Sequence, residues 1–121
     1  MATQAERREA TRGRLLDAAA RLFAEQGYES TSTQQILDAA GTSRGALYHH
    51  FATKQAIFEA VFERVSNEAI SRAMRGTTSG SALEALTRSC LNWLREVRRP
   101  EVGAILIEQG PQVLGWKRAR D

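Results

Sequence analysis

The sequence of 121 residues predicts an all-α protein, and three observations support this class. Apolar residues recur at the spacing of a helix face along most of the chain. Glycines and capping residues mark the points where these periodic segments stop and restart. No segment shows the two-residue alternation that is typical of a half-buried strand. The chain is therefore expected to form a series of helices joined by short turns.

Residues 5–27 form the first periodic segment, a helix that is expected to end after Gln26. Its apolar side has helical spacing and is formed by Leu15, Leu16, Ala19, Leu22 and Phe23. Gly27 follows directly and is a natural stop, because glycine adopts the left-handed conformation that often ends a helix.

Two short helices are expected next. Ser32 and Gln35 have the spacing of a capping box, which predicts a helix start at Thr33. Gly41 ends that helix, and Ser43 begins another as its N-cap. Two helices joined by so short a turn are typical of a helix-turn-helix, in which the second helix enters the major groove of DNA.

The sequence predicts helices in the rest of the chain as well. Thr53 is expected to cap a long helix from Lys54 to about Met74, and GTTSGS (76–81) is a loop by composition. A fifth helix follows and ends near Pro100, and its apolar stripe is formed by Leu83, Leu86, Cys90, Leu94 and Val97. A short apolar helix, VGAILIEQ, then precedes Gly110-Pro111 and a last segment.

Charge and composition narrow the classes of function. The net charge of +3 and the pI near 9.6 permit nucleic-acid binding without requiring it. The single cysteine excludes an internal disulfide framework. The apolar runs are too short for a secretory signal or a membrane span, so a cytoplasmic location is expected. An enzyme, a cofactor and a metal centre find no support, because the sequence has no phosphate loop, no metal-ligand spacing and no recognisable nucleophile–base pair.

The run LLDAAARLFAEQGYESTSTQQILDAAGTSRGALYHHFATKQAIFEAV (15–61) resembles the DNA-binding head of the tetracycline-repressor (TetR) family of bacterial regulators. The resemblance implies a helix-turn-helix head in residues 1–53. It also implies a connecting helix and the N-terminal part of an effector-binding and dimerisation domain in residues 54–121. Family members are usually longer, so this second domain is expected to be truncated.

The same resemblance implies a function. It predicts a transcriptional repressor that binds a palindromic double-stranded operator as a homodimer and releases it when a small-molecule effector binds. The alternative is a DNA-binding head without working ligand control, either as a fragment or as a constitutive binder. The length of the chain is the feature that separates these two interpretations.

Each residue expected at the DNA has a simpler structural alternative. Tyr48 and Lys54 match phosphate-contacting positions of the family, but a packed tyrosine and a solvated lysine are the alternatives. Arg44 can read guanine or hold a phosphate, and Gln34 can pair with adenine. The residues expected to contact DNA are Thr33, Gln34, Ser43, Arg44, Gly45, Ala46, Tyr48, His49, His50 and Lys54.

The two adjacent histidines also raise the question of a metal site. Neighbouring helical side chains point about 100° apart, so they cannot share one ion as an i, i+4 pair can. Outside the head, an effector cavity has only weak candidates, and for any single one of them a plain core role is favoured. These candidates are Phe62, Cys90, Trp93 and Leu106.

Overall fold

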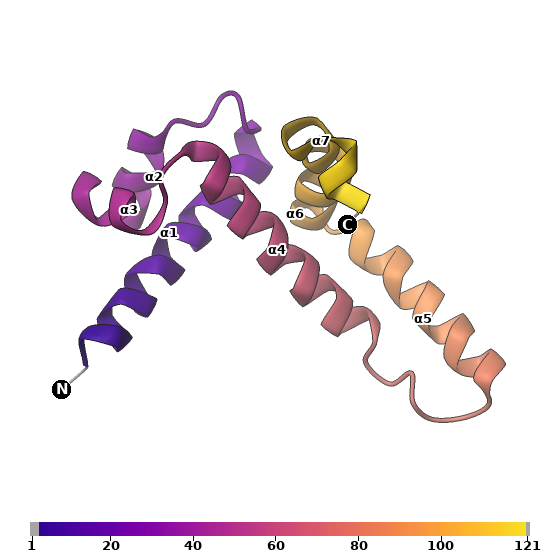
Figure 1. Cartoon of the computed structure of the whole chain (residues 1–121). Coiled ribbons are helices and arrows are strands. Elements are labelled where there is room, and N and C mark those ends of the chain that lie inside the picture. The colour runs from indigo at the N-terminus through magenta and orange to yellow at the C-terminus, as the bar shows by residue number, and fades with distance from the viewer. Residues whose placement is uncertain (1–2, 121) are drawn as a thin grey trace. The chain divides into compact units, whose positions relative to one another are not determined.

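The computed structural model describes the backbone of residues 3–120 and the side chains of residues 3–115, and every regular element in it is a helix. The elements are α1 (Gln4–Gln26), α2 (Thr33–Ala40), α3 (Arg44–His50), α4 (Lys54–Ala73), α5 (Ala82–Val97), α6 (Pro100–Val102), the π-helical η1 (Gly103–Gln109) and α7 (Gly110–Arg120) (Figure 1). Because the described residues contain no strand, the predicted all-α class is confirmed.

The chain divides into two compact units, Met1–Val61 and Phe62–Asp121. The division falls inside α4 and not at its first residue, where the sequence suggested a boundary. The first turns of α4 bury Ile57, Phe58 and Val61, and this burial makes them part of the first unit.

In the first unit, the local signals of the sequence set the helix ends. Gly27 follows α1 with φ 86°, and Gly41 follows α2 in the left-handed conformation with φ 65°. Ser32 and Gln35 form the predicted capping box of α2. The Thr53 hydroxyl accepts a hydrogen bond from the backbone N–H of Ala56 at 3.0 Å, so it caps α4 as predicted.

The core of the first unit is apolar and partly aromatic. Phe23 of α1 and Phe58 of α4 are fully buried, with ring centroids 5.4 Å apart. Tyr28, in the loop between α1 and α2, lies 5.5 Å from Phe58 in an edge-to-face arrangement. Such aromatic pairs contribute about 0.5–1.5 kcal/mol beyond the burial of their area. Leu47 of α3 is also fully buried, so α3 is anchored to this core by one side.

The second unit joins the end of α4 to α5, which runs back beside it after the loop at 74–81 (Figure 1). Buried Glu96 of α5 accepts a hydrogen bond from Nε of Arg72 at 2.7 Å and lies 3.3 Å from Nε of Arg99. The Asn92 side chain donates to the carbonyl oxygens of Ala73, the last residue of α4, and of Arg75 in the turn that follows. These polar contacts fix α5 against α4.

The apolar stripe of α5 does not form a core among the described residues. Leu83, Leu86 and Leu94 are 74%, 62% and 58% exposed, and Cys90 is exposed as well. Helical periodicity identifies an apolar face but not the surface that covers it, because burial depends on neighbouring elements. Cys90 belongs to this stripe and is exposed together with it.

The last segment also differs from the prediction. The helix does not stop at Gly110-Pro111, because η1 continues directly into α7 and the non-helical residue is Gly115, with φ 77°. The N–H of Gly110 donates to the carbonyl of Ile105, which is a π-helical bond. Pro111, which has no N–H, follows where the hydrogen-bond register changes. A Cβ on Gly110 would lie 2.5 Å from Cε2 of Phe62, so glycine allows this close approach.

Candidate nucleic-acid interface

The turn between α2 and α3 presents one side of α3 to solvent. Gly41 reverses the chain, and the Ser43 hydroxyl accepts a hydrogen bond from the N–H of Ala46 at 3.2 Å. Leu37 and Leu47 are buried beneath the two helices. Because α3 is held by Leu47, its opposite side is free to enter a groove of DNA, as the second helix of a helix-turn-helix does.

The two predicted base readers contact each other. One guanidinium nitrogen of Arg44 donates to Oε1 of Gln34 at 2.8 Å, and Nε2 of Gln34 donates to Oδ1 of Asp38 at 2.9 Å. All three side chains are exposed. The network therefore joins α2 to α3 at the surface through side chains.

The exposed side of α3 carries the aromatic residues predicted at the DNA. Tyr48 is 47% exposed, and His49 is exposed as well. A Cβ on Gly45 would meet no atom within 4 Å, so packing inside the protein does not require glycine at this position. Glycine weakens a helix interior by about 1 kcal/mol relative to alanine. Its presence is thus consistent with close approach of an external surface.

Lys54 has structural contacts that the sequence did not reveal. Its Nζ donates to the carbonyl oxygens of Tyr28 at 2.9 Å and of Thr31 at 3.2 Å. The same atom lies 4.1 Å from the centroid of the Tyr28 ring, within the range of a cation–π interaction. Lys54 is half-buried and fastens the start of α4 to the loop before α2. An ammonium group has three donors, so the two carbonyl oxygens do not use all of them.

Thr33 and Ala46 are half-buried, and both lie at the edges of this surface. Thr33 is the first residue of α2, and Ser32, not Thr33, provides its capping hydroxyl. The Thr33 hydroxyl is therefore not needed as the helix cap. Ala46 lies on the side of α3 that faces α1, where it lines a groove together with His49 and His50.

This groove, between α1 and α3, was missed by the sequence analysis. It has a volume of about 510 Å³, and α1 contributes Gln4, Arg7, Arg8 and Thr11 to its lining. One signal in the sequence could have pointed to this groove. Arginine recurs in ERR and in EATRGR, which follows it, so several cations lie on one short stretch of helix.

The two histidines sit at the wall of this groove. Their ring centroids are 5.4 Å apart and their planes are nearly perpendicular. Burial lowers the pKa of His50, and the nearby His49, Arg12 and Arg8 lower it further, while Glu9 opposes them. His50 is therefore harder to protonate than an ordinary histidine. Within the described residues, no group of three or more His, Cys, Asp or Glu side chains is arranged to hold a metal ion.

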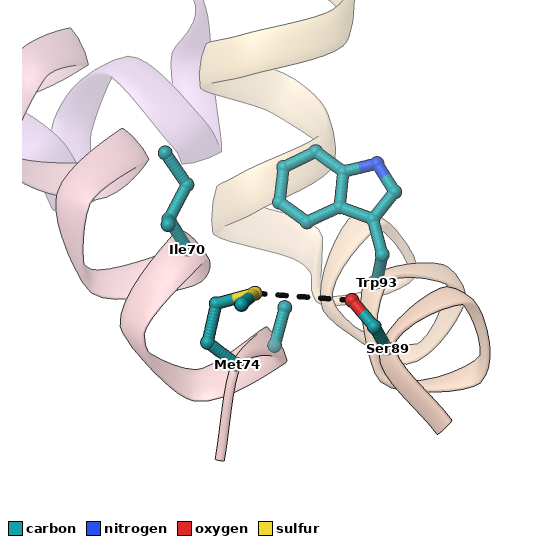
Figure 2. A pocket seen from close by; sticks show the side chains of 5 residues that line it. Ile70, Met74, Ser89 and Trp93 are labelled. Atoms are coloured by element: carbon teal, nitrogen blue, oxygen red, sulfur yellow. Dashed lines mark hydrogen bonds between the residues drawn. The ribbon is translucent and has the colours of Figure 1, made fainter. Parts of the chain in front are cut away.

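The second unit contains an apolar pocket of about 330 Å³ between α4 and α5. It is lined by Ile70, Ala73, Met74, Ser89 and Trp93, and the indole of Trp93 faces the side chains from α4 (Figure 2). The Ser89 hydroxyl donates to the sulfur of Met74 at 3.8 Å. This wall offers a small apolar ligand an aromatic face, a thioether and one hydroxyl group.

Only one of the four predicted effector residues lines this pocket. Trp93 does so, whereas Cys90 lies on the exposed side of α5. Phe62 is half-buried against Gly110, and Leu106 is half-buried in η1. Ile70, Met74 and Ser89 were missed, because the sequence showed their helical periodicity but not which faces of α4 and α5 would meet.

An all-α chain with this α2–turn–α3 arrangement is a helix-turn-helix protein. Residues 15–61 match the sequence model of the N-terminal domain of the bacterial regulatory proteins of the tetR family. These are the same residues that carried the resemblance in the sequence. Residues 15–61 are therefore similar to the N-terminal domain of the tetR family of bacterial regulatory proteins.

Two curated relatives match 44% and 62% of the chain. It is 49% identical over 53 residues to the HTH-type transcriptional regulator AcrR of Shigella flexneri, covering 44% of this chain and 25% of that protein. It is 38% identical over 79 residues to the HTH-type transcriptional repressor KstR2 of Rhodococcus jostii, covering 62% and 39%. The chain thus spans 39% or less of the length of these relatives.

Solved structures match more of the chain. A TetR-family transcriptional regulator from Pectobacterium atrosepticum is 35% identical with a TM-score of 0.79, covering 94% of this chain and 59% of that one. A gamma-butyrolactone receptor described as ArpA-like is 40% identical with a TM-score of 0.66, covering 83% and 53%. No described helix has the combination of length and apolar character needed to cross a membrane.

Proposed function

We propose that this protein is a sequence-specific DNA-binding transcriptional regulator and that it acts as a repressor released by a small-molecule effector. The observation that carries the proposal is the solvent-exposed side of α3, with Arg44 joined to Gln34 of α2, inside a domain of the tetR family. In this proposal the first unit is the DNA-binding head. The protein works in the cytoplasm, where its DNA is.

The roles at the DNA follow from chemistry and exposure. Arg44 and Gln34 read base edges, since Arg pairs bidentately with guanine and Gln with adenine. Tyr48, Thr33 and the remaining donor of Lys54 contact phosphates, which supply affinity without sequence information. The other contacts in the proposed interface are made by Ser43, Gly45, Ala46, His49 and His50.

Effector control is assigned to the second unit. The pocket lined by Trp93 and Met74 is apolar, which suits a small, mostly uncharged ligand. A γ-butyrolactone is the first ligand to test, because one structural neighbour is described as a receptor for that class. Helix α4 provides residues to both units, so a ligand that moves the end of α4 can change the position of its start.

In a homodimer, this movement of α4 would change the affinity for the operator. Two recognition helices bind half-sites about 34–36 Å apart, so a change in their separation weakens binding to a palindromic operator. The ligand acts only through a higher affinity for the released state, and its own affinity must therefore fall when operator is bound. Equal effector affinity with and without saturating operator would rule out this coupling.

The test of DNA binding starts from selection. The full chain is used to enrich binding sites from a randomised duplex library, and affinity for the enriched site is compared with a scrambled duplex at the same salt concentration. We expect a two-fold symmetric site and a preference of several orders of magnitude. Equal affinity for both duplexes would contradict a sequence-specific regulator. Operator binding that no ligand alters would favour a head without ligand control.

A further inference from the structure

The groove between α1 and α3 brings two arginines of one helix close to two histidines of the other. Arg7 and Arg8 line it from α1, and His49 and His50 line it from α3. Among the described residues, no salt bridge joins Arg7 or Arg8 to a carboxylate within 4.0 Å. Nearby Glu6 is engaged at the start of α1, where its side chain accepts from the N–H of Thr3 at 2.9 Å. In the part of the chain that the structure describes, Arg7 and Arg8 therefore line the groove without an ion-pair partner.

The position of the groove relates it to DNA. An α-helix with its side chains is about 10–12 Å wide and the major groove is about 12 Å wide, so a helix in the groove has a phosphate strand on each side. On one side of α3, Arg44 reaches Gln34 of α2. On its other side, Ala46, His49 and His50 face the first turns of α1.

We propose that the groove lined by Arg7, Arg8, His49 and His50 is a second phosphate site, which holds the DNA strand on the α1 side of α3. The proposal rests on the proposed DNA-binding function and adds α1 to its contact surface. Arginine donates to phosphate through a fork of N–H groups, and a protonated histidine donates through both ring nitrogens. The site recognises backbone only, so it adds affinity without sequence preference.

The histidine in this site makes binding sensitive to pH. Burial lowers the pKa of His50 most, His49 on α3 and Arg12 and Arg8 on α1 lower it further, and Glu9 on α1 raises it. A phosphate in the groove would offset the repulsion from Arg12 and Arg8 and favour the charged form. Protonation and DNA binding then support each other, so affinity rises as the pH falls from 7.5 to 5.5.

The test compares three variants, each of which replaces one arginine and so removes one positive charge. Arg7→Gln and Arg8→Gln remove groove cations, and Arg21→Gln is the matched control, because Arg21 is exposed on the same helix about 20 Å from Arg8. Affinity for a 30-base-pair random duplex and for the selected site is measured over a range of salt. Each groove variant should reduce the slope of log affinity against log salt by about 0.9, equally for both duplexes, and Arg21→Gln should not.

A second measurement uses His50→Gln, with its thermal stability recorded to confirm folding. The affinity of the unchanged protein for the random duplex should rise on acidification, and this rise should be reduced in the variant. Unchanged salt slopes for both groove variants, or slopes reduced equally by Arg21→Gln, would overturn the proposal. If the chain shows no sequence preference but the groove variants still reduce the salt slope, the phosphate site is supported and the proposed regulator function is contradicted. No binding to any duplex overturns both.

Discussion

Lys54 has two assigned roles, and the variant Lys54→Met separates them. Methionine keeps an unbranched apolar stem but has no charge and no donor. The change removes both hydrogen bonds from Nζ to the carbonyls of Tyr28 and Thr31 and the contact with the Tyr28 ring. If these contacts fasten α4 to the first unit, the variant must unfold more easily, whether or not DNA is present.

The magnitude follows from these contacts. A hydrogen bond to a charged group contributes about 1.5–3 kcal/mol, and a partly exposed cation–π contact about 0.5–1 kcal/mol. Lys54 is only half-buried, so water replaces part of what is lost. We expect a loss of about 2–4 kcal/mol, which is a large share of the 5–15 kcal/mol that a domain usually has.

The assay is urea unfolding followed by circular dichroism, with DNA affinity measured under conditions where each variant is folded. Gln55→Met is the control, because Gln55 is the exposed next residue of α4 and its replacement should change stability by no more than about 0.5 kcal/mol. An Lys54→Met protein as stable as the control would refute the fastening role. Reduced affinity without reduced stability would leave Lys54 as a phosphate ligand alone.

The remaining predictions concern the core, the interface and pH. Phe58→Ala should cost about 3–5 kcal/mol in urea unfolding, because the ring is fully buried against Phe23; a loss under 1 kcal/mol would contradict that packing. Tyr48→Ala should weaken binding to all duplexes alike, whereas Arg44→Ala should relax one base position by about 1–3 kcal/mol, as read by selection. Because the pKa of His50 is lowered, its contribution to stability is present above pH 6.5 and is lost as the pH falls further. His50→Gln should therefore lose less stability than the unchanged protein between pH 7 and pH 5.

Helix ends and the α2–α3 turn could be predicted because their causes are local. The capping box of Ser32 and Gln35 and the left-handed Gly41 involve residues close in sequence. Such signals act within one turn of helix, so the sequence contains all the information that they require. The same holds for the buried position of Leu47, which follows from the helical period around it.

Contacts between distant segments could not be predicted in this way. Lys54 reaches carbonyl groups more than twenty residues away, and nothing next to it in the sequence indicates that path. The sequence also did not show that the apolar stripe of α5 is exposed or that the helix continues through Gly110-Pro111, and the reason is related. Periodicity and helix-breaking residues describe a segment alone, whereas burial and a π-helical register depend on the elements packed against it.

Arg44 and Lys54 also differ in how firmly they are held, and this difference fits their proposed roles. The bond from Arg44 to Gln34 is exposed, and water can replace it at little cost, since exposed polar pairs contribute about 0–1 kcal/mol. A base reader must give up its partner when DNA arrives, so a weak partner preserves its orientation without opposing binding. Lys54 instead donates to two carbonyl groups of the loop before α2, and we expect it to keep these contacts when DNA binds. The exposed network of Arg44 thus favours exchange with a base, and the half-buried contacts of Lys54 favour transmission of movement along α4.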